Sequence, residues 1–328
     1  MKLRARVDVV RGPFRARNAN RAWSERASLH LILGDADVEG EGEASPLPAY
    51  SPDTLDEARE QLLALDGLEV DPLDPFAALP PLRASAAFAA EVALLDWQSK
   101  RAGWPFGALI GGPRHERLEL AALVDDLDAG RARLAAGYRR LKLKIGADLD
   151  QELALARTLR AEGAVLRFDA NGALDPAALP AVLEGLAALD AELLEEPCPG
   201  PWPVASPVPL AVDESLFRDP ERALDRLRSG EARWAVLKPT CLGGPRALDA
   251  LSETIHRAGA RVLFSHTFGG PLERAATGAL ALALGDGAPG LAPHGGLDVW
   301  PAAILNAFDG ALLRPSTTPG LGVRWEGR

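Results

Sequence analysis

Charged side chains recur at a regular interval through the second half of this 328-residue chain. Each one closes a short apolar run, and successive members lie 25, 26, 18 and 25 positions apart: Lys144, Asp169, Glu195, Asp213 and Lys238. One strand with its following helix in an α/β barrel takes up a similar length of chain. The spacing therefore predicts that each charge ends one strand, at the face where barrel enzymes keep their active sites.

Apolar runs alternate with helical patterns over the same part of the chain, which favours a (β/α)8-type barrel, a modified TIM barrel. A doubly wound open sheet is the structural alternative, but no glycine-rich phosphate motif follows the first strand, so nucleotide binding is not supported. The expected strands are residues 118–124, 141–145, 165–169, 192–196, 210–213, 234–238, 261–265 and, more weakly, 290–293.

The N-terminal part has a different pattern and predicts a small α+β unit. Residues 3–10 and 27–33 have strand character, and the polar, arginine-rich stretch 12–26 between them is expected to be a loop. We predict a capping domain over residues 1–95, joined by the C-terminal segment 300–328, and a catalytic barrel over residues 96–299.

Three carboxylates end successive strands: Asp169, Glu195 and Asp213. Ionised carboxylates that converge on one barrel mouth repel each other unless a cation lies between them. Hard oxygen ligands suit Mg²⁺, for which Mn²⁺ can substitute. The other interpretation is that each acid caps a helix or pairs with an arginine.

Lysine is scarce here, because five of the 36 basic residues are lysine and the other 31 are arginine. A lysine amine can lose its proton and act as a base, whereas arginine stays charged. Lys142 and Lys144 lie two apart on one strand and so point to the same side, while Lys238 comes from a later strand. Two neighbouring ammonium groups are expected to depress each other's pKa. Such a set could move a proton next to a metal-stabilised enolate.

Composition excludes several classes of partner. The net charge of −10 argues against nucleic acid and against an anionic membrane surface, and no apolar run is long enough to cross a membrane. Two cysteines, Cys198 and Cys241, make no disulfide framework, and the first residues do not resemble a secretory signal. We therefore expect a cytoplasmic location.

The set Lys142-x-Lys144, Asp169, Glu195, Asp213 and Lys238 resembles the muconate-lactonizing subgroup of the enolase superfamily. The resemblance implies Mg²⁺-assisted removal of a proton α to a carboxylate of a small-molecule substrate, which gives an enediolate. It implies that Lys144 is the base and that Lys142 tunes it. Lys238 would be the acid/base on the opposite face or a cation over the intermediate.

Within the subgroup, three runs are most similar to the o-succinylbenzoate synthases, dehydratases of menaquinone synthesis: residues 42–52, 195–198 and 295–298. The resemblance assigns Arg167 to the succinyl carboxylate, and Asn171, Ser265 and Gly296 to the substrate pocket. It also implies that the 12–26 loop closes over the substrate as a cationic lid, with the arginines Arg15, Arg17, Arg21 and Arg26.

Two other functions stay open at this point. N-acylamino acid racemases share the lysines and the acids. Dipeptide epimerases usually carry D-x-D at the eighth strand, where this chain has Asp298 with Gly296 two positions before it. A non-catalytic barrel that binds metal and a partner protein is the alternative outside enzymes, and the retained lysines argue against it. The sequence leaves the oligomeric state undetermined.

Overall fold

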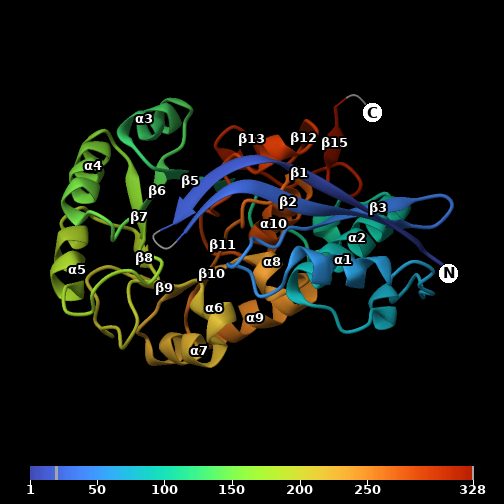
Figure 1. The fold of residues 1–328 in the computed structure, drawn as a ribbon, viewed down its shortest axis with the longest axis horizontal. Coiled ribbons are helices and arrows are strands. Elements are labelled where there is room, and N and C mark those ends of the chain that lie inside the picture. The colour runs from blue at the N-terminus through green and yellow to red at the C-terminus, as the bar shows by residue number, and fades with distance from the viewer. Residues whose placement is uncertain (19–20, 327–328) are drawn as a thin grey trace.

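A curved sheet of seven parallel strands forms the larger part of the molecule (Figure 1). The computed structural model describes residues 1–18 and 21–326, apart from the side chains of Arg17 and Asn18. Each strand pairs with the next one along the chain. The strands are β5 (Ala121–Val124), β6 (Arg140–Lys144), β7 (Val165–Asp169), β8 (Leu193–Glu195), β9 (Leu210–Val212), β10 (Trp234–Leu237) and β11 (Arg261–Phe264).

Helices connect these strands, except β8 and β9, and pack on the outside of the sheet (Figure 1). They are α3 (Leu127–Ala135), α4 (Leu149–Ala161), α5 (Leu179–Ala187), α6 (Ser215–Arg218), α7 (Pro220–Ser229), α8 (Pro239–Leu242), α9 (Pro245–Arg257) and α10 (Pro271–Leu284). Three of them begin at an aspartate whose side chain accepts a bond from the first turn: Asp126, Asp148 and Asp219. The predicted barrel is thus confirmed.

The eighth strand was expected over residues 290–293, and this prediction is wrong in its extent. The described chain forms only one bridge there, between Ser265 and Gly290. The Gly290 amide donates to the Phe264 carbonyl at 2.9 Å, and the Ala121 amide donates to the Pro289 carbonyl at 2.9 Å. Proline has no amide hydrogen to extend a ladder, so Pro289 and Pro293 confine the pairing to this bridge. The bridge joins β11 to β5.

A three-stranded antiparallel sheet makes up the N-terminal unit, in the order β1 (Arg4–Asn18), β2 (Arg21–Gly34) and β3 (Glu39–Ala44). The loop predicted over residues 12–26 is wrong for its described part, because β1 extends to Asn18, β2 begins at Arg21, and the two strands pair as a long ribbon with a register shift between Pro13 and Ala16. Residues 19–20 of the predicted loop lie outside the described residues. Hydrogen bonds between the backbones of the two strands hold this ribbon together, and they do not require alternating apolar side chains. Sequence analysis, which relies on that alternation, therefore did not detect it. In Figure 1 the ribbon extends from the N-terminal unit across the barrel.

Helices α1 (Leu55–Leu63) and α2 (Ala84–Ala102) complete this unit, with short 3₁₀ turns at η1 (Pro75–Ala78) and η2 (Phe106–Ile110). The two faces of α2 pack on different cores: Phe88 and Val92 join the barrel core, whereas Leu94 and Trp97 join the core beneath β1–β3. Strand β3 approaches α2 closely at Gly42, where a Cβ would lie 2.1 Å from the Ala89 carbonyl oxygen.

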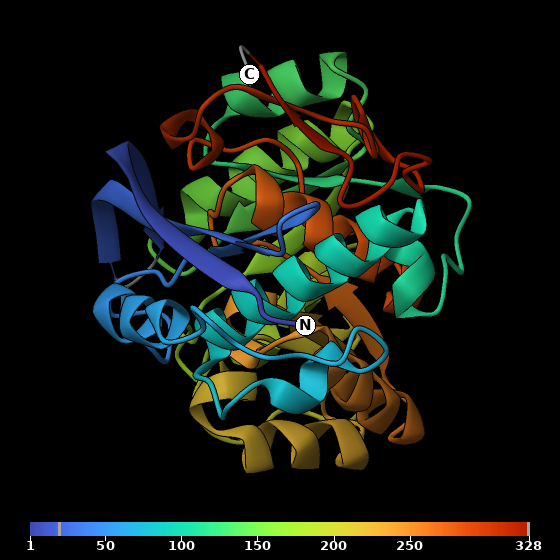
Figure 2. The same cartoon turned by 90° about the vertical axis from the view of Figure 1, so that its right-hand side faces the viewer.

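The C-terminal segment returns to the N-terminal unit (Figure 2). It contains the turn η3 (Leu297–Val299) and the strands β12 (Ala303–Leu305), β13 (Phe308–Asp309), β14 (Leu312–Leu313) and β15 (Val323–Trp325), and β14 pairs with β4 (Leu118–Glu119). The Trp325 indole donates to Glu41 on β3 at 2.9 Å. Division of the chain at residue 95 stays a prediction. Among the described helices, none is long and apolar enough to span a bilayer.

Candidate active site

The register of the parallel sheet places the predicted site residues side by side at the C-terminal ends of neighbouring strands. Lys144 on β6 pairs in register with Asp169 on β7, and Asp169 pairs with Glu195 on β8. Alternate side chains of a strand point to the same side, so the three side chains share the inside of the barrel. Asp213 directly follows β9 and Lys238 directly follows β10. The regular spacing in the sequence therefore corresponds to a ring of strand ends.

A cavity of about 790 Å³, open to solvent, lies at these strand ends. Its polar wall includes Lys142, Lys144, Asp169, Glu195 and Lys238. Its apolar wall includes side chains from both parts of the molecule: Trp23 and Leu47 from the N-terminal unit, and Leu123, Val236, Leu263, Phe264 and Phe268 from the barrel. A pocket with largely apolar walls and a few convergent polar groups is typical of a small-molecule site.

Lys142 lies between two acids. Its Nζ is 2.8 Å from Asp169 Oδ2 and donates to Glu195 Oε2 at 2.5 Å. Burial acts to lower the pKa of Lys142, but the charges of Asp169 and Glu195 outweigh it and raise that pKa above its ordinary value. The expectation that the two lysines depress each other's pKa is therefore wrong for Lys142, because its acid partners are closer.

Lys144 has the opposite electrostatic balance. Burial lowers its pKa to about 8, and the charges of Lys142 and Lys238 act in the same direction, against the charge of Asp169. An amine with this pKa is partly neutral at physiological pH, as a general base must be. The prediction that Lys144 is the base remains a prediction, and its electrostatics support it.

Lys238 is held by three groups on the opposite wall. Its Nζ donates to Asp213 and to the Tyr50 hydroxyl, the latter at 2.5 Å, and lies 3.9 Å from Glu214 Oε1. Burial acts to lower the pKa of Lys238, but Asp213 and Glu214 raise it. Lys238 is therefore a buried cation in this arrangement.

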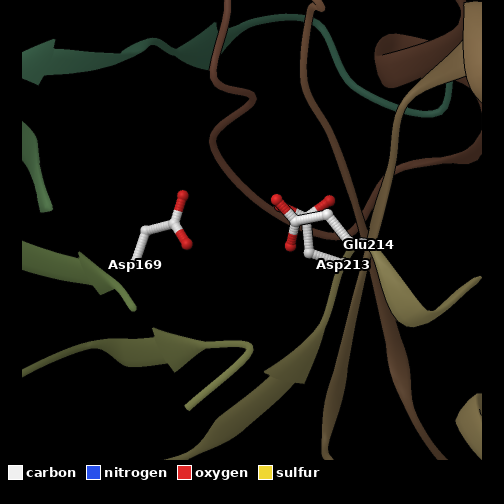
Figure 3. Close-up of side chains that lie close together, drawn as sticks. All are labelled: Asp169, Asp213 and Glu214. Carbon is white, nitrogen blue, oxygen red and sulfur yellow. The ribbon is translucent and has the colours of Figure 1, made fainter. Parts of the chain in front are cut away.

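The acids whose oxygens converge in the structure differ by one residue from the three that sequence analysis selected. Asp169, Asp213 and Glu214 each offer a carboxylate oxygen within 4.8 Å of the others. Figure 3 shows the carboxylates of Asp213 and Glu214 facing that of Asp169. Glu195 is instead bonded to Lys142. Glu214, which sequence analysis did not select, immediately follows Asp213, and this adjacency was the available signal.

Two carboxylate oxygens of this group fit a cation. Asp213 Oδ1 and Glu214 Oε2 are buried and have no hydrogen-bond partner within the described part of the chain. Buried oxygens of this kind cost free energy unless something compensates them. Burial and the neighbouring charge of Glu214 raise the pKa of Asp213 well above its usual range. Converging hard oxygen donors are the ligands that Mg²⁺ takes in proteins.

Arg167 and Asn171 both line the cavity, although protein groups engage them there. Arg167 Nε donates to Glu192 at 2.5 Å and its Nη1 donates to the Ala288 carbonyl at 2.7 Å. Asn171 Nδ2 donates to Glu214 Oε1 at 2.7 Å. The predicted contact between Arg167 and a substrate carboxylate would have to use the remaining donors of a guanidinium that is already paired.

The other two predicted substrate residues are placed differently. Ser265 lines the cavity next to Gly290, at the bridge that closes the barrel. Gly296 does not line this cavity. It packs against the loop after β11, where a Cβ would lie 2.2 Å from the Phe268 carbonyl oxygen, so a close backbone approach requires glycine.

The arginines of the predicted lid divide into separate groups. Arg26 is fully buried, and its guanidinium donates to the Pro46 carbonyl at 2.9 Å and the Phe268 carbonyl at 2.8 Å, so its assignment to a lid is wrong. Arg15 is exposed and lines a second cavity that shares Leu123, His266 and Phe268 with the first. Arg21 is exposed on β2, and the side chain of Arg17 lies outside the described residues.

Sequence analysis also missed Tyr50. It is 9% exposed, lies on the connection between β3 and α1, and its hydroxyl donates to Glu214 Oε1 at 3.0 Å. This residue falls within the 42–52 run that carries part of the family resemblance. Its contact with Glu214 spans 164 positions in the chain, which no local pattern reveals.

Comparison with known proteins places this chain in a family. Residues 126–328 match the family model described as Enolase C-terminal domain-like. The chain is 34% identical over 180 residues to an o-succinylbenzoate synthase of Desulfotalea psychrophila, covering 48% of each protein. It is 31% identical over 212 residues to muconate cycloisomerase 1 of Pseudomonas putida, covering 59% of this chain and 55% of that enzyme. The aligned regions thus span about half the length of these two relatives.

A longer alignment is with an N-succinylamino acid racemase of Thermus thermophilus, at 31% identity over 255 residues, covering 70% of this chain and 68% of the racemase. Among solved structures, a muconate lactonizing enzyme of Pseudomonas fluorescens in complex with muconolactone superimposes with a TM-score of 0.82 at 25% identity, covering 99% of this chain and 96% of that one. The predicted fold and family are confirmed: this chain belongs to the enolase superfamily, in its muconate-lactonizing subgroup.

Proposed function

We propose that this protein is a Mg²⁺-dependent dehydratase that forms 2-succinylbenzoate from a hydroxylated succinyl-cyclohexadiene carboxylate in menaquinone biosynthesis. The reaction begins with removal of the proton α to the ring carboxylate. The 34% identity to an o-succinylbenzoate synthase supports this choice. So does the absence of a D-x-D motif at the eighth strand position, where Gly296 and Asp298 stand.

The observation that carries the proposal is the difference between the two lysine walls. Lys144 has a pKa of about 8, whereas Lys238 is held by Asp213 and the Tyr50 hydroxyl and its pKa is raised. This gives one base on one face of the cavity and one fixed cation on the other. A syn elimination needs only one base, while racemisation needs a base on each face.

The proton transfers balance on Lys144 alone. Its neutral amine takes the α-proton, the C–H bond breaks, and the electron pair moves into the carboxylate to give the enediolate. The pair then returns to form the ring double bond as the C–O bond breaks. The proton on Lys144 leaves with the departing hydroxide as water, and the amine is neutral again.

The other residues stabilise charge and fix geometry. Lys142 stays protonated between Asp169 and Glu195 and so holds the pKa of Lys144 down. Lys238 would place a positive charge near the intermediate. Mg²⁺, when bound, would stabilise negative charge on the substrate carboxylate. Asp169 and Asp213 would hold the ion with either Glu195, as the family resemblance implies, or Glu214, whose oxygen lies within 4.8 Å of theirs.

A racemase of N-acylamino acids, or a dipeptide epimerase, is the second candidate. Of the three sequence alignments reported above, the one with an N-succinylamino acid racemase covers the largest share of both proteins. Lys144 and Lys238 come from β6 and the end of β10, on different walls of the cavity, so each could serve one face of a substrate. In this function Lys238 would have to give up its proton during each cycle.

Three assays on the full chain with Mg²⁺ separate these functions. Dehydration of the cyclohexadiene carboxylate is followed by ultraviolet absorbance. Racemisation of N-succinyl amino acids and epimerisation of dipeptides are followed by exchange of the α-proton in D₂O. We expect dehydration to have the highest kcat/KM. A higher kcat/KM for either exchange reaction would replace the dehydratase with the second candidate. We further propose a cytoplasmic location and a small-molecule carboxylate as the partner.

A further inference from the structure

One side chain of the N-terminal unit contacts a candidate catalytic lysine of the barrel. The Tyr50 hydroxyl accepts a bond from Lys238 Nζ at 2.5 Å and donates one to Glu214 Oε1 at 3.0 Å. Lys238 Nζ lies 5.2 Å from the centroid of the Tyr50 ring. Both polar functions of the phenol are thus directed at the active site.

The loop that carries Tyr50 is fixed from several sides. Arg26 donates to the carbonyls of Ser45 and Pro46, and the Trp23 indole donates to the Pro48 carbonyl at 3.0 Å. Ala49, immediately before Tyr50, has a φ of 55°, a left-handed conformation that a residue with a side chain seldom adopts. Backbone strain of this kind persists only where surrounding structure imposes it.

The ring is also held in place. It packs edge-on against Trp23 and Phe217, with ring centroids 6.4 and 5.6 Å away, and the Arg218 guanidinium lies over it at 5.4 Å. These neighbours come from β2 and α6, so both parts of the molecule determine where the hydroxyl lies. Its position is therefore determined before any substrate arrives.

Lys238 needs such a partner. It is 7% exposed, and its closest acid is Asp213. Asp213 is also one of the acids that would hold the metal. A carboxylate that is shared with a metal is a weaker partner for an ammonium group, and a buried ammonium retains its geometry only through its remaining bonds. Tyr50 is the neutral group that can supply one.

We propose that Tyr50 is a positioning residue for Lys238, supplied by the N-terminal unit, so that the catalytic cation takes its place only when that unit is seated on the barrel. Tyr50 acts through Lys238 and takes no proton from the substrate. The inference rests on the proposed proton-transfer function, because it assumes that Lys238 has a catalytic part.

The chain offers a matched control. Tyr50 and Tyr138 are its two tyrosines. Tyr138 is equally buried, and its hydroxyl donates to the Gly310 carbonyl at 3.2 Å, outside the cavity. Tyr50→Phe and Tyr138→Phe each remove one bonded hydroxyl from a buried ring. A loss common to both variants therefore reports on folding, and a loss specific to Tyr50→Phe reports on Lys238.

The first measurement needs no substrate. Reductive methylation of the folded protein, read by peptide mass spectrometry, gives the rate at which Lys238 is modified relative to the exposed Lys2. Loss of one hydrogen bond to a charged group should speed Lys238 modification at least about threefold in Tyr50→Phe. Tyr138→Phe should match the unsubstituted protein. An unchanged Lys238 rate in Tyr50→Phe means that the hydroxyl does not hold the lysine, and the proposal fails.

The second measurement uses whichever of the three reactions the protein catalyses. Tyr50→Phe should lower kcat at least about tenfold and leave KM within about twofold. If the reaction is the dehydration, for which Lys238→Arg should retain activity, the same substitution in that background should cause no further loss, because the residues act as one unit. A kcat within twofold of the unsubstituted protein, or a full additional loss in the double variant, overturns the proposal whatever the labelling shows. If the protein catalyses none of the three reactions, the proposed function has failed, and the labelling alone decides whether Tyr50 positions Lys238.

Discussion

The β6 wall and the β10 wall of the cavity each present lysine, but in different surroundings. On β6, Lys142 forms ion pairs with Asp169 and Glu195. Lys144, on the same strand, has a pKa lowered to about 8. At the end of β10, Lys238 is alone on its wall, holds an acid of its own and receives a hydroxyl from the N-terminal unit. The same residue type thus has a lowered pKa on one wall and a raised pKa on the other.

This difference in pKa arises from burial, which lowers the pKa of Lys144, and from the charges that lie next to each lysine. An ammonium group with acids in contact keeps its proton, and one with other ammonium groups nearby loses it more readily. The predictions below test whether the two walls differ in this way.

The largest effect is expected when the metal is removed, because its candidate ligands contact lysines on both walls: Asp169 pairs with Lys142, and Asp213 pairs with Lys238. Excess EDTA should abolish turnover, and Mg²⁺ or Mn²⁺ should restore it, because negative charge on the substrate carboxylate is otherwise uncompensated. Titration calorimetry of Glu195→Gln and Glu214→Gln identifies the third ligand as the variant that loses more Mg²⁺ affinity. Full activity in excess EDTA would contradict the metal assignment.

Lys144→Arg tests the β6 wall directly. A guanidinium keeps its proton, so kcat should fall by about 10²–10⁴-fold, the usual contribution of a general base. Exchange of the α-proton with D₂O should stop as well. Lys100→Arg is the control, since Lys100 pairs with Asp96 outside the cavity and its substitution preserves that charge. If Lys144→Arg turned over like the unsubstituted protein, Lys142 or Lys238 would have to be the base.

Lys238→Arg tests the β10 wall. Because the positive charge stays, dehydration should retain part of its rate, with a loss of about 10- to 100-fold from altered geometry. Racemisation should vanish, since an arginine cannot act as the base for the second face. A dehydratase rate reduced as far as in Lys144→Arg would show that the two walls do not differ in role.

The pH dependence sharpens the contrast further. Lys144 is active as the neutral amine, so kcat should rise about tenfold per pH unit below its pKa and level off at or below pH 8, since a bound cation lowers that pKa further. Raising the pH to 8 therefore increases activity. A kcat that stays flat from pH 6 to 9 would remove Lys144 from the role of base.

The smallest effect is expected at the ribbon. Arg15 is exposed and lines the second cavity, so a carboxylate arm of the substrate would gain from its charge, and Arg15→Ala should raise KM about threefold with kcat unchanged. Arg11→Ala is the control, because Arg11 lies on the same strand, 3.6 Å from Glu25 and outside both cavities. Equal KM values in the two variants would leave Arg15 as a surface charge.

The barrel and its ring of charges could be predicted from the sequence because one geometric rule links them. Neighbouring parallel strands need a long crossover connection, usually a helix, and this repeat spaced Lys144 and Asp169 by 25 positions and Asp213 and Lys238 by the same number. Lys142 followed from the alternation of side chains along a strand.

The missed features depend on contacts between distant parts of the chain. Arg26 was interpreted as a surface charge because a buried arginine is rare, and its carbonyl partner at Phe268 lies 242 positions away. Tyr50 reaches Lys238 across 188 positions. At the eighth strand position, the effect of the prolines on strand pairing is local in the sequence. The closure of the barrel at that position depends on contacts with β5 and β11, which lie far away in the chain. Each of these needs the assembled fold before it can be recognised.

The barrel closes between β11 and β5 through the single bridge between Ser265 and Gly290 and the neighbouring backbone bonds. Strands β5 and β6 pair along a continuous ladder from Ala121 to Val124. The closure between β11 and β5 has fewer backbone hydrogen bonds: the amides of Gly290 and Ala121 donate at 2.9 Å, and the His266 amide donates to the Gly290 carbonyl at 3.4 Å. Regions with few backbone bonds open first in native-state hydrogen exchange. The amide of Gly290 should therefore exchange before those of the β6–β7 ladder. Because Ser265 and Gly290 also line the cavity, transient opening at this closure would widen the active site between β11 and β5.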